Sequence, residues 1–349
     1  MKAAIFHGPR HVELGKRPDP KVENPTDAIV RVVMGCVCGS DLWYYRGITE
    51  HAVGSIGHEF IGVIEELGQE TKNLAKGDLV IAPFKFSDGV CANCKFGFPS
   101  DCVQGGAFGS GDNDGGQGQF VRVPFAGTTL VKVPKGAYPE DMLASFLALS
   151  DVMCTGYHAV VSAGVKKGDT VAVVGDGAVG LSAVIGAKLK GAGRILALSR
   201  NPARQKLATE FGATGIVEQR GDEATQAIKK LTDGTGVDAA LECVGSDESM
   251  STCVGIVRAG GMIGAVGVPN YEHFKYQDLF WKNAGVRGGI APARQYIPEL
   301  LEAVLKGTIN PGRVFDLRTD LDHIAEAYAA MDERRAVKSL LRVSDLHEK

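Results

Sequence analysis

The chain has 349 residues, with 38 Lys and Arg against 41 Asp and Glu, so its formal net charge is −3. This near balance gives no broad field that would attract a phosphate backbone or an anionic membrane, which argues against nucleic-acid and membrane partners. Hydrophobic residues make up 44% and charged residues 23%, as is typical of a folded globular protein. No apolar run approaches the ~18–20 residues of a membrane span. We therefore expect a cytoplasmic protein of about two domains.

Glycine and cysteine stand out in the composition. Glycine accounts for 46 residues without a collagen-like period, which indicates many tight turns and close backbone approaches. The 8 cysteines are too few for a disulfide scaffold in a chain of this length. Clustered cysteines in an intracellular protein more often bind a metal or take part in catalysis.

The first 150 or so residues read as short apolar runs broken by Gly, Pro and Asp, at 28–34, 61–67, 79–84 and 120–124. This spacing predicts a β-rich, turn-dense unit, such as a partly open barrel or a sandwich. A helix interrupted by small residues is expected over 144–163.

Strand-like and helix-like segments then alternate. The expected strands are 170–174, 194–199, 215–217, 237–244 and 262–266, and the expected helices are 179–190, 202–211, 224–231 and 249–257. Such alternation predicts βαβ units and a doubly wound parallel sheet of the α/β class. The alternation stops near Gly288, and the tail contains helices at 296–306 and 321–334 and a strand at 337–343. We expect a catalytic domain formed by 1–152 and 290–349, around an inserted dinucleotide-binding domain at 153–289.

A glycine-rich turn follows the strand that ends at Val174. It reads Gly175-Asp176-Gly177-Ala178-Val179-Gly180 and leads into a helix. This is the G-x-G-x-x-G pattern in its strand–turn–helix context, with a tight turn, a close backbone approach to pyrophosphate and close helix–strand packing. The expected cofactor contacts are Gly175, Gly177, Ala178, Val179 and Gly180. The alternative is a glycine turn without a ligand.

The end of the next strand distinguishes the two nicotinamide cofactors. NAD sites usually have an acid there that binds the ribose 2′-hydroxyl, whereas a 2′-phosphate needs a cation. Ser199 and Arg200 stand at this position, with Arg204 one helical turn later. These residues predict NADP(H) rather than NAD(H). Alternatively, Ser199 caps the following helix and Arg200 is a surface residue.

Cys38 in a Gly-Cys-Val-Cys-Gly-Ser-Asp segment and His58-Glu59 form a second pattern. Together, ahead of the dinucleotide unit, these motifs resemble those of the zinc-dependent medium-chain alcohol dehydrogenases, over the whole chain from a GroES-like part through a Rossmann insert. The resemblance implies that Cys38 and His58 bind a catalytic zinc ion, with Glu59 as an outer or transient ligand. It also implies that Asp151 is the third ligand, as in the tetrameric NADP-dependent secondary-alcohol dehydrogenases of bacteria.

The resemblance extends to weaker positions. Gly267 matches a stretch along the nicotinamide, and Lys338 or Arg342 is a candidate pyrophosphate contact. Subunits of the family associate through their Rossmann sheets, so a homo-oligomer is expected, a tetramer rather than a dimer.

A further cysteine cluster contains Cys91, Cys94 and Cys102. The structural zinc lobe of the family has C-x-x-C-x-x-C followed by a later cysteine, and here the third position of the triplet is interpreted as missing. Three thiolates would hold zinc if Asp101, Asp88 or water completed the shell. A metal-free lobe with reduced thiols is the open alternative.

The resemblance also assigns the proton path and part of the substrate pocket. Ser40 matches the hydroxyl that relays the proton of the substrate, but Trp43 occupies the position of the histidine that often follows, which leaves ribose hydroxyls, Tyr44, His51 or water as the outer end. Trp43 and Phe84 are the expected pocket walls, with Phe108 and Trp281 as further candidates; each taken singly is also compatible with a core position.

These motifs predict a zinc-dependent oxidoreductase that interconverts small-molecule alcohols with aldehydes or ketones, using a nicotinamide cofactor with NADP(H) preferred. A polyol, threonine or formaldehyde dehydrogenase of the same family, using NAD(H), is the alternative enzyme. A zinc-free NADPH-dependent quinone reductase or binding protein is a third possibility, against which the Cys38, His58 and Asp151 set argues.

Overall fold

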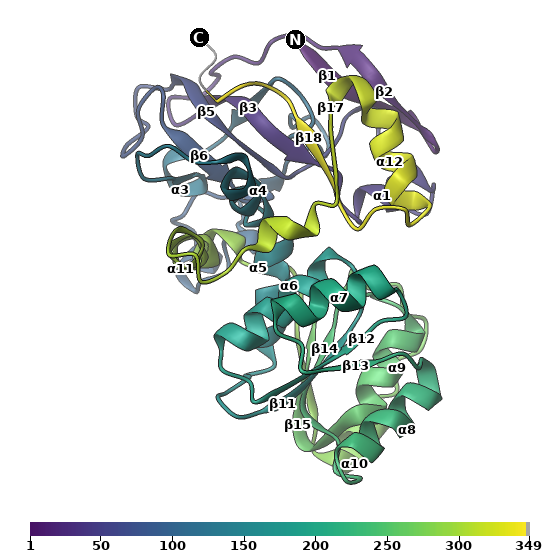
Figure 1. Ribbon diagram of the computed structural model, residues 1–349. Helices are drawn as coiled ribbons and strands as arrows, with labels where there is room; N and C mark the ends of the chain where they lie inside the picture. The colour runs from purple at the N-terminus through teal and green to yellow at the C-terminus, as the bar shows by residue number, and fades with distance from the viewer. Residues whose placement is uncertain (347–349) are drawn as a thin grey trace. The chain divides into compact units, whose positions relative to one another are not determined.

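A computed structural model describes residues 1–346 of the chain (Figure 1). The chain divides into two compact units: unit 1 comprises Met1–Asp151 and Pro292–Lys349, and unit 2 comprises Val152–Ala291. The helix expected over 144–163 is two helices, α4 (Glu140–Ala148) and α5 (Val152–Ser162), and the chain passes from one unit to the other between them.

Unit 1 is built on a seven-stranded sheet in which β9 pairs with β3 beside the path β10-β6-β5-β3-β18-β17. Its central strand β3 (Ala28–Cys36) is buried along its whole length and runs antiparallel to both β5 (Phe60–Leu67) and β18 (Ser339–Arg342). The remaining strands are β6 (Leu79–Ala82), β9 (Phe120–Val123), β10 (Val131–Lys132) and β17 (Leu317–Asp320). The last described strand thus completes a sheet begun by the first part of the chain.

Two smaller sheets and short helices complete unit 1. The sheets are β2-β1-β4, with β1 (Lys2–Gly8), β2 (His11–Lys16) and β4 (Gly54–Ser55), and β7-β8, with β7 (Lys85–Phe86) and β8 (Gly106–Ala107). The other helices are α1 (Asp41–Tyr45), α2 (Ala92–Lys95), α3 (Ala126–Thr129), α11 (Ala293–Leu305) and α12 (Ile324–Asp332), with 3-10 turns at Pro99–Asp101, Pro311–Val314 and Leu321–His323.

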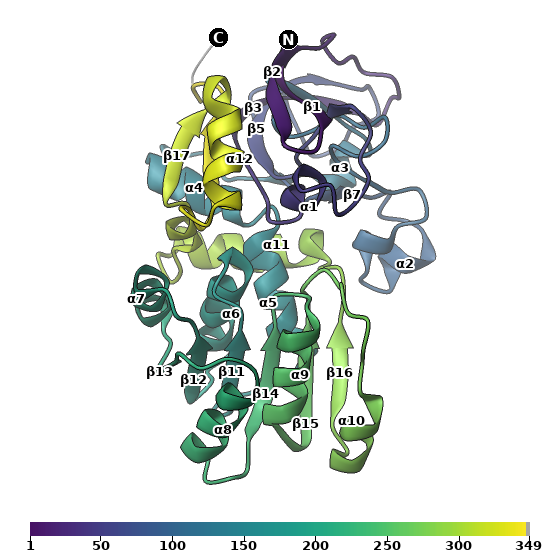
Figure 2. The same ribbon diagram turned by 90° about the vertical axis from the view of Figure 1, so that its right-hand side faces the viewer.

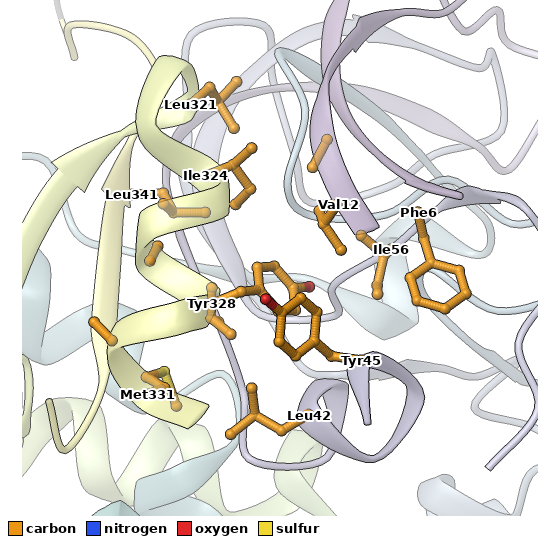
Figure 3. Packing of buried hydrophobic residues seen from close by; sticks show 14 of the residues in the cluster. Phe6, Val12, Leu42, Tyr45, Ile56, Leu321, Ile324, Tyr328, Met331 and Leu341 are labelled. Carbon is orange, nitrogen blue, oxygen red and sulfur yellow. The ribbon is translucent and has the colours of Figure 1, made fainter. Parts of the chain in front are cut away.

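A hydrophobic cluster joins α12 to the first hairpin and to α1 (Figure 3). The rings of Tyr45 and Tyr328 lie 5.3 Å apart at its centre, and Phe6, Val12 and Ile324 are buried around them. Burial of such apolar side chains stabilises a domain by about 1.5–3 kcal/mol each. This cluster therefore fixes the C-terminal segment onto the N-terminal part of unit 1.

Unit 2 contains a six-stranded parallel sheet in the order β13-β12-β11-β14-β15-β16, seen across its width in Figure 2. The strands are β11 (Thr170–Val174), β12 (Arg194–Leu198), β13 (Gly215–Val217), β14 (Val237–Glu242), β15 (Val257–Ala265) and β16 (Gly285–Gly288). Besides α5, its helices are α6 (Ala178–Leu189), α7 (Pro202–Phe211), α8 (Gly221–Leu231), α9 (Asp247–Ile256) and α10 (Tyr276–Lys282). The strand order reverses between β11 and β14, so the carboxyl end of β11 is at a topological switch point, where such sheets bind ligands. The predicted α/β class with a doubly wound parallel sheet is confirmed.

Among residues 1–346, no single helix is both long enough and apolar enough to cross a bilayer. The helices α4 and α5 reach that length and composition only when they are counted together.

Candidate metal centres and nucleotide site

Four side chains of unit 1 bring their donor atoms within 4.8 Å of one another: Cys38, His58, Glu59 and Asp151. His58 Nε2 lies 3.2 Å and Cys38 Sγ 3.8 Å from the same oxygen, Oδ2 of Asp151. Cys38 follows β3 and His58-Glu59 precede β5, and since these strands are antiparallel neighbours, the two segments meet. A thiolate, an imidazole and carboxylates are the ligands that zinc prefers, so this donor set fits a zinc ion.

Asp41 orients the imidazole of this centre. Its Oδ1 lies 3.4 Å from His58 Nδ1, and its Oδ2 accepts a hydrogen bond from the backbone N–H of Cys38 at 2.9 Å. Burial lowers the pKa of His58, but the charge of Asp41, together with Cys38 and Asp151, raises it well above its ordinary value. With Nδ1 facing Asp41, Nε2 is directed toward Asp151, the arrangement in which a carboxylate fixes the orientation of a metal-binding histidine.

A buried lysine compensates the charge of Glu59. Lys338 Nζ lies 2.6 Å from Glu59 Oε1 and donates a second hydrogen bond to the Val37 carbonyl at 3.1 Å. The side chains of Lys338 and Glu59 are 1% and 0% exposed. Burial lowers the pKa of Lys338, but Cys36, Glu59 and Cys38 raise it well above its ordinary value, so the ammonium stays protonated. The lysine proposed from sequence as a pyrophosphate contact is therefore bound to Glu59.

The other oxygen of Glu59, Oε2, is buried and has no hydrogen-bond partner among residues 1–346. A buried carboxylate oxygen without a donor is costly, and a cation beside it would remove that cost. This observation supports the fit of a metal ion to the cluster of Cys38, His58 and Asp151.

Gln117 connects this centre to α12. Its Nε2 donates to the Cys36 carbonyl and to Asp41 Oδ2, each at 3.1 Å, and its Oε1 accepts from the Tyr328 hydroxyl at 3.0 Å. Sequence reasoning missed Gln117, and it missed Asp41 although Asp41 is three residues after Cys38 in the same motif.

The proton-path candidates lie around α1. Ser40 is the N-cap residue of α1, and its carbonyl accepts the backbone N–H of Trp43 at 3.1 Å. Tyr44 and His51 lie with ring centroids 4.5 Å apart, and His51 Nε2 is 2.7 Å from the Gly109 carbonyl oxygen. Trp43 is half-buried on the same helix.

The aromatic side chains expected to line the substrate pocket lie in different surroundings. The Phe84 ring meets His58 edge-on at 6.2 Å, which places it beside one of the candidate metal ligands. Phe108, in contrast, is buried in the core against Phe60 and Phe86. Trp281 of unit 2 is 74% exposed, and α10 leads into the amino end of β16, whereas the glycine turn follows the carboxyl end of β11.

A second group of possible metal donors consists of Asp88, Cys91, Cys94 and Cys102, whose donor atoms again lie within 4.8 Å of one another. Asp88 Oδ1 accepts backbone hydrogen bonds from Val90 at 2.8 Å and Cys91 at 3.0 Å, and Cys91 Sγ lies 3.8 Å from Cys102 Sγ. Burial raises the pKa of Asp88, but the two backbone donors lower it to about 2, so the carboxylate is charged.

Asp88 stands three residues before Cys91, so the residue that differs from the cysteine triplet is the first and not the third. Asp101, another candidate from sequence, lies outside the group and accepts a hydrogen bond from Ser100 Oγ at 2.9 Å. Three thiols and one carboxylate fit a tetrahedral zinc site.

The glycine turn of unit 2 has the backbone that its pattern requires. Gly175 has φ +124°, and a Cβ on Gly180 would lie 2.0 Å from the Gly175 carbonyl oxygen. Gly177 is the N-cap residue of α6, and a Cβ there would meet nothing within 4 Å. Ala178 and Val179 follow as the first helical residues. The helix N-terminus and the open space over Gly177 fit a pyrophosphate.

Ser199 and Arg204 both contact Asp176 of this turn. Ser199 Oγ donates to Asp176 Oδ2 at 2.8 Å, and Arg204 Nη1 lies 3.2 Å from Asp176 Oδ1. Arg200 is exposed. The side chain of Asn201, rather than Ser199, caps α7, so the alternative role considered for Ser199 is not found.

Gly267 follows β15 at the same edge of the sheet. Its backbone N–H donates to the Glu242 carbonyl at 3.2 Å, and a Cβ on it would lie 2.2 Å from the Gly245 nitrogen. Only glycine fits this close approach between the ends of β14 and β15.

Comparisons with known proteins agree with this description. A family model described as alcohol dehydrogenase GroES-like domain matches residues 24–135, and one described as zinc-binding dehydrogenase matches residues 178–306. The zinc-type alcohol dehydrogenase B of Aspergillus flavus is 33% identical over 99% of this chain and 82% of its own length. The NADP-dependent isopropanol dehydrogenase of Thermoanaerobacter brockii is 34% identical over 91% of this chain and 92% of its own.

Among solved structures, alcohol dehydrogenase TADH from Thermus sp. ATN1 aligns with a TM-score of 0.90 at 32% identity, over 99% of this chain and 100% of that chain. Such matches extend over nearly the whole sequence, and the protein is therefore a member of the zinc-dependent medium-chain alcohol dehydrogenase family, an oxidoreductase family.

Proposed function

We propose that the protein interconverts alcohols with aldehydes or ketones, with a zinc ion held by Cys38, His58 and Asp151 and a nicotinamide cofactor on unit 2. The convergence of these three donors with Glu59 is the observation that carries the proposal. A zinc ion bound there would act as a Lewis acid toward the oxygen of the substrate, and the cofactor would supply the hydride chemistry.

The side chains around the ligands have distinct tasks in this proposal. Asp41 holds the imidazole of His58 in the orientation that directs Nε2 to the metal position. Lys338 balances the carboxylate of Glu59, so that the buried centre does not accumulate negative charge. Ser40, at the start of α1, supplies the hydroxyl that takes the proton of the substrate.

We assign NADP(H) as the preferred cofactor. Ser199 and the exposed Arg200 follow β12, where an acid would bind the 2′-hydroxyl of NAD, and a guanidinium binds phosphate with charge and fork geometry. The relative from Thermoanaerobacter brockii, named as NADP-dependent, supports this assignment.

A second zinc ion is proposed for Asp88, Cys91, Cys94 and Cys102, where it would cross-link residues of the 88–102 segment. Structural zinc sites are closed four-ligand sites of this kind.

We further propose a cytoplasmic homo-oligomer, a tetramer rather than a dimer. All 8 cysteines are free thiols, as is usual in a reducing compartment. The strand β16 forms one edge of its sheet, and an edge strand can pair with a second copy. Light scattering of the purified protein measures the subunit number directly.

The test is zinc content and alcohol oxidation measured together on protein purified without added metal. The wild type is expected to hold two zinc ions per chain, and Cys38→Ala to lose one of them together with alcohol oxidation while NADP⁺ still binds. Cys253→Ala, a buried cysteine of α9, is the matched control and is expected to keep both metal and turnover. Full turnover in Cys38→Ala, or a zinc-free wild type that added zinc does not activate, would contradict the proposed mechanism.

A further inference from the structure

The cofactor loop of unit 2 carries an acid at a position that the glycine pattern leaves unspecified. Asp176 follows Gly175 by one residue, and its carboxylate contacts both Ser199 and Arg204. We propose that Asp176 sets how strongly the site distinguishes a 2′-phosphate from a 2′-hydroxyl on the adenosine ribose of the cofactor. This inference rests on the proposed binding of a nicotinamide dinucleotide at this turn.

The parallel pairing of β11 and β12 explains how this acid reaches the end of the second strand. Val174 and Leu198 are register partners, so the residues that follow each strand lie side by side. Asp176 is two residues beyond Val174, and Ser199 is one residue beyond Leu198. The carboxylate that NAD sites usually carry after the second strand is here supplied by the loop after the first strand.

The charges at this position oppose one another. Arg204 Nη1 contacts Asp176 Oδ1 at 3.2 Å and also the Asp176 carbonyl oxygen at 3.4 Å, and these two side chains are 9% and 14% exposed. Arg204 is thus bound to a carboxylate, while Arg200 remains exposed.

A 2′-phosphate placed beside Ser199 therefore meets the attraction of Arg200 and the repulsion of Asp176. A 2′-hydroxyl meets no such repulsion, and it can donate a hydrogen bond to the carboxylate. The wild-type site is expected to accept both cofactors, with a smaller preference for NADP⁺ than Ser199 and Arg200 alone would produce.

A purely structural role for Asp176 gives a different expectation. If the carboxylate served only to hold the two loops together, its removal would weaken the binding of both cofactors by the same factor. The ratio of the two dissociation constants separates these roles, since loop positioning cancels in the ratio and the interaction with the phosphate does not.

The experiment measures Kd for NADP⁺ and NAD⁺ by isothermal titration calorimetry on the full zinc-loaded chain. In Asp176→Asn, the ratio of Kd(NAD⁺) to Kd(NADP⁺) is expected to rise about tenfold over the wild type, because one nearby negative charge is removed at nearly constant shape. A rise of less than about threefold, or a fall, would overturn the proposal. Asp176→Ser, which keeps a polar group in a shorter side chain, is measured in the same way if the first variant does not fold.

Glu210→Gln is the matched control. Glu210 is an exposed residue near the carboxyl end of α7, so this variant removes one negative charge from the helix that carries Arg204 while leaving Asp176 intact. Its ratio is expected to stay within about threefold of the wild type, and an increase as large as that of Asp176→Asn would show a general charge effect and reject the proposal. The wild-type ratio tests NADP preference separately, because a value below one contradicts that preference whatever Asp176 does.

Discussion

Lys338 and Glu59 form a fully buried ion pair at 2.6 Å, between residues that are 279 positions apart in the chain. The pair stands beside the donor group of Cys38, His58 and Asp151. A buried ion pair contributes little net stability compared with apolar packing, but the loss of one partner is costly because the other charge remains buried. The pair is therefore better explained by the charge balance of the proposed metal centre than by the stability of unit 1.

Lys338→Met is expected to lower the free energy of unfolding by about 3–5 kcal/mol at pH 7, because it leaves the carboxylate of Glu59 buried without its partner. The double variant Lys338→Met/Glu59→Gln should recover much of this loss. Urea unfolding measures the free energy of unfolding of the single and the double variant. Lys306→Met, which removes an exposed pair with Glu302, is the control, and a loss in Lys338→Met as small as in this control would show that the buried pair has no such role.

Asp41→Asn is expected to weaken zinc binding at the proposed catalytic centre about 10- to 100-fold, because His58 loses the carboxylate that orients its ring. Competition with a chromophoric chelator measures this affinity. The control is Asp27→Asn, which changes a buried carboxylate of unit 1 that pairs with Arg122. Equal zinc affinity in Asp41→Asn and the control would exclude the orienting role.

Tyr328→Phe removes the hydroxyl that donates to Gln117 while keeping the ring in the cluster of Figure 3. The buried amide oxygen of Gln117 then lacks this donor, so we expect a loss of about 1–3 kcal/mol in the free energy of unfolding. Tyr45→Phe removes the hydroxyl of the neighbouring ring and is the control. It should lower the free energy of unfolding by less than Tyr328→Phe does. Chemical denaturation measures the free energy of unfolding of both variants. Equal losses would argue against a stabilising role for the hydrogen bond between Tyr328 and Gln117.

Asp332→Asn tests a pair of surface contacts at the end of α12. Asp332 accepts from Arg46 at 2.6 Å and also pairs with Arg10. Partial burial raises the pKa of Asp332, but the two arginines lower it below its ordinary value. Both arginines are partly exposed, so the expected loss at pH 7 is about 1 kcal/mol.

The depressed pKa of Asp332 gives this loss a pH dependence. The stabilisation is fully present above the unfolded-state value of about 3.9, and it disappears as pH falls through the lower folded-state value. Wild type and Asp332→Asn should therefore converge in stability below about pH 4. Unfolding curves at pH 7 and at acidic pH measure the difference in stability between the wild type and Asp332→Asn. The control is Asp322→Asn, which changes an exposed residue that pairs with Lys2. A difference that stays constant over this range would contradict the assignment.

The sequence predicted the α/β class and most elements of unit 2, because its strands are short buried runs bounded by turn residues. The strand 170–174 and the helix 202–211 coincide with β11 and α7. The segments α10 and β16 were missed, since Phe280 and Trp281 are exposed on α10 and β16 is a short, glycine-flanked edge strand. Neither segment has the hydrophobic periodicity that indicates a buried face.

The site was predictable to the extent that its residues belong to local motifs. The glycine turn was named from its spacing, and Cys38, His58 and Asp151 were named from the resemblance of their motifs to those of a known family. The structure brings these three side chains together. Gln117 and Lys338 carry no such signal, because their partners Asp41 and Glu59 are 76 and 279 residues away. Asp88 was left among several candidates because the position of the lost cysteine was assigned to the wrong end of the triplet.

The residues of the two units become available at different times during synthesis of the chain. All of unit 2 leaves the ribosome as one continuous segment, whereas unit 1 needs residues from both sides of it. At ~5–20 residues per second, Glu59 emerges roughly 15–55 s before Lys338. During that interval the carboxylate has no lysine to neutralise it, and β3 lacks its neighbour β18. The nascent chain can therefore complete unit 2 first, and the charge of Glu59 is balanced by a lysine only once Lys338 and the adjoining strand β18 have been made.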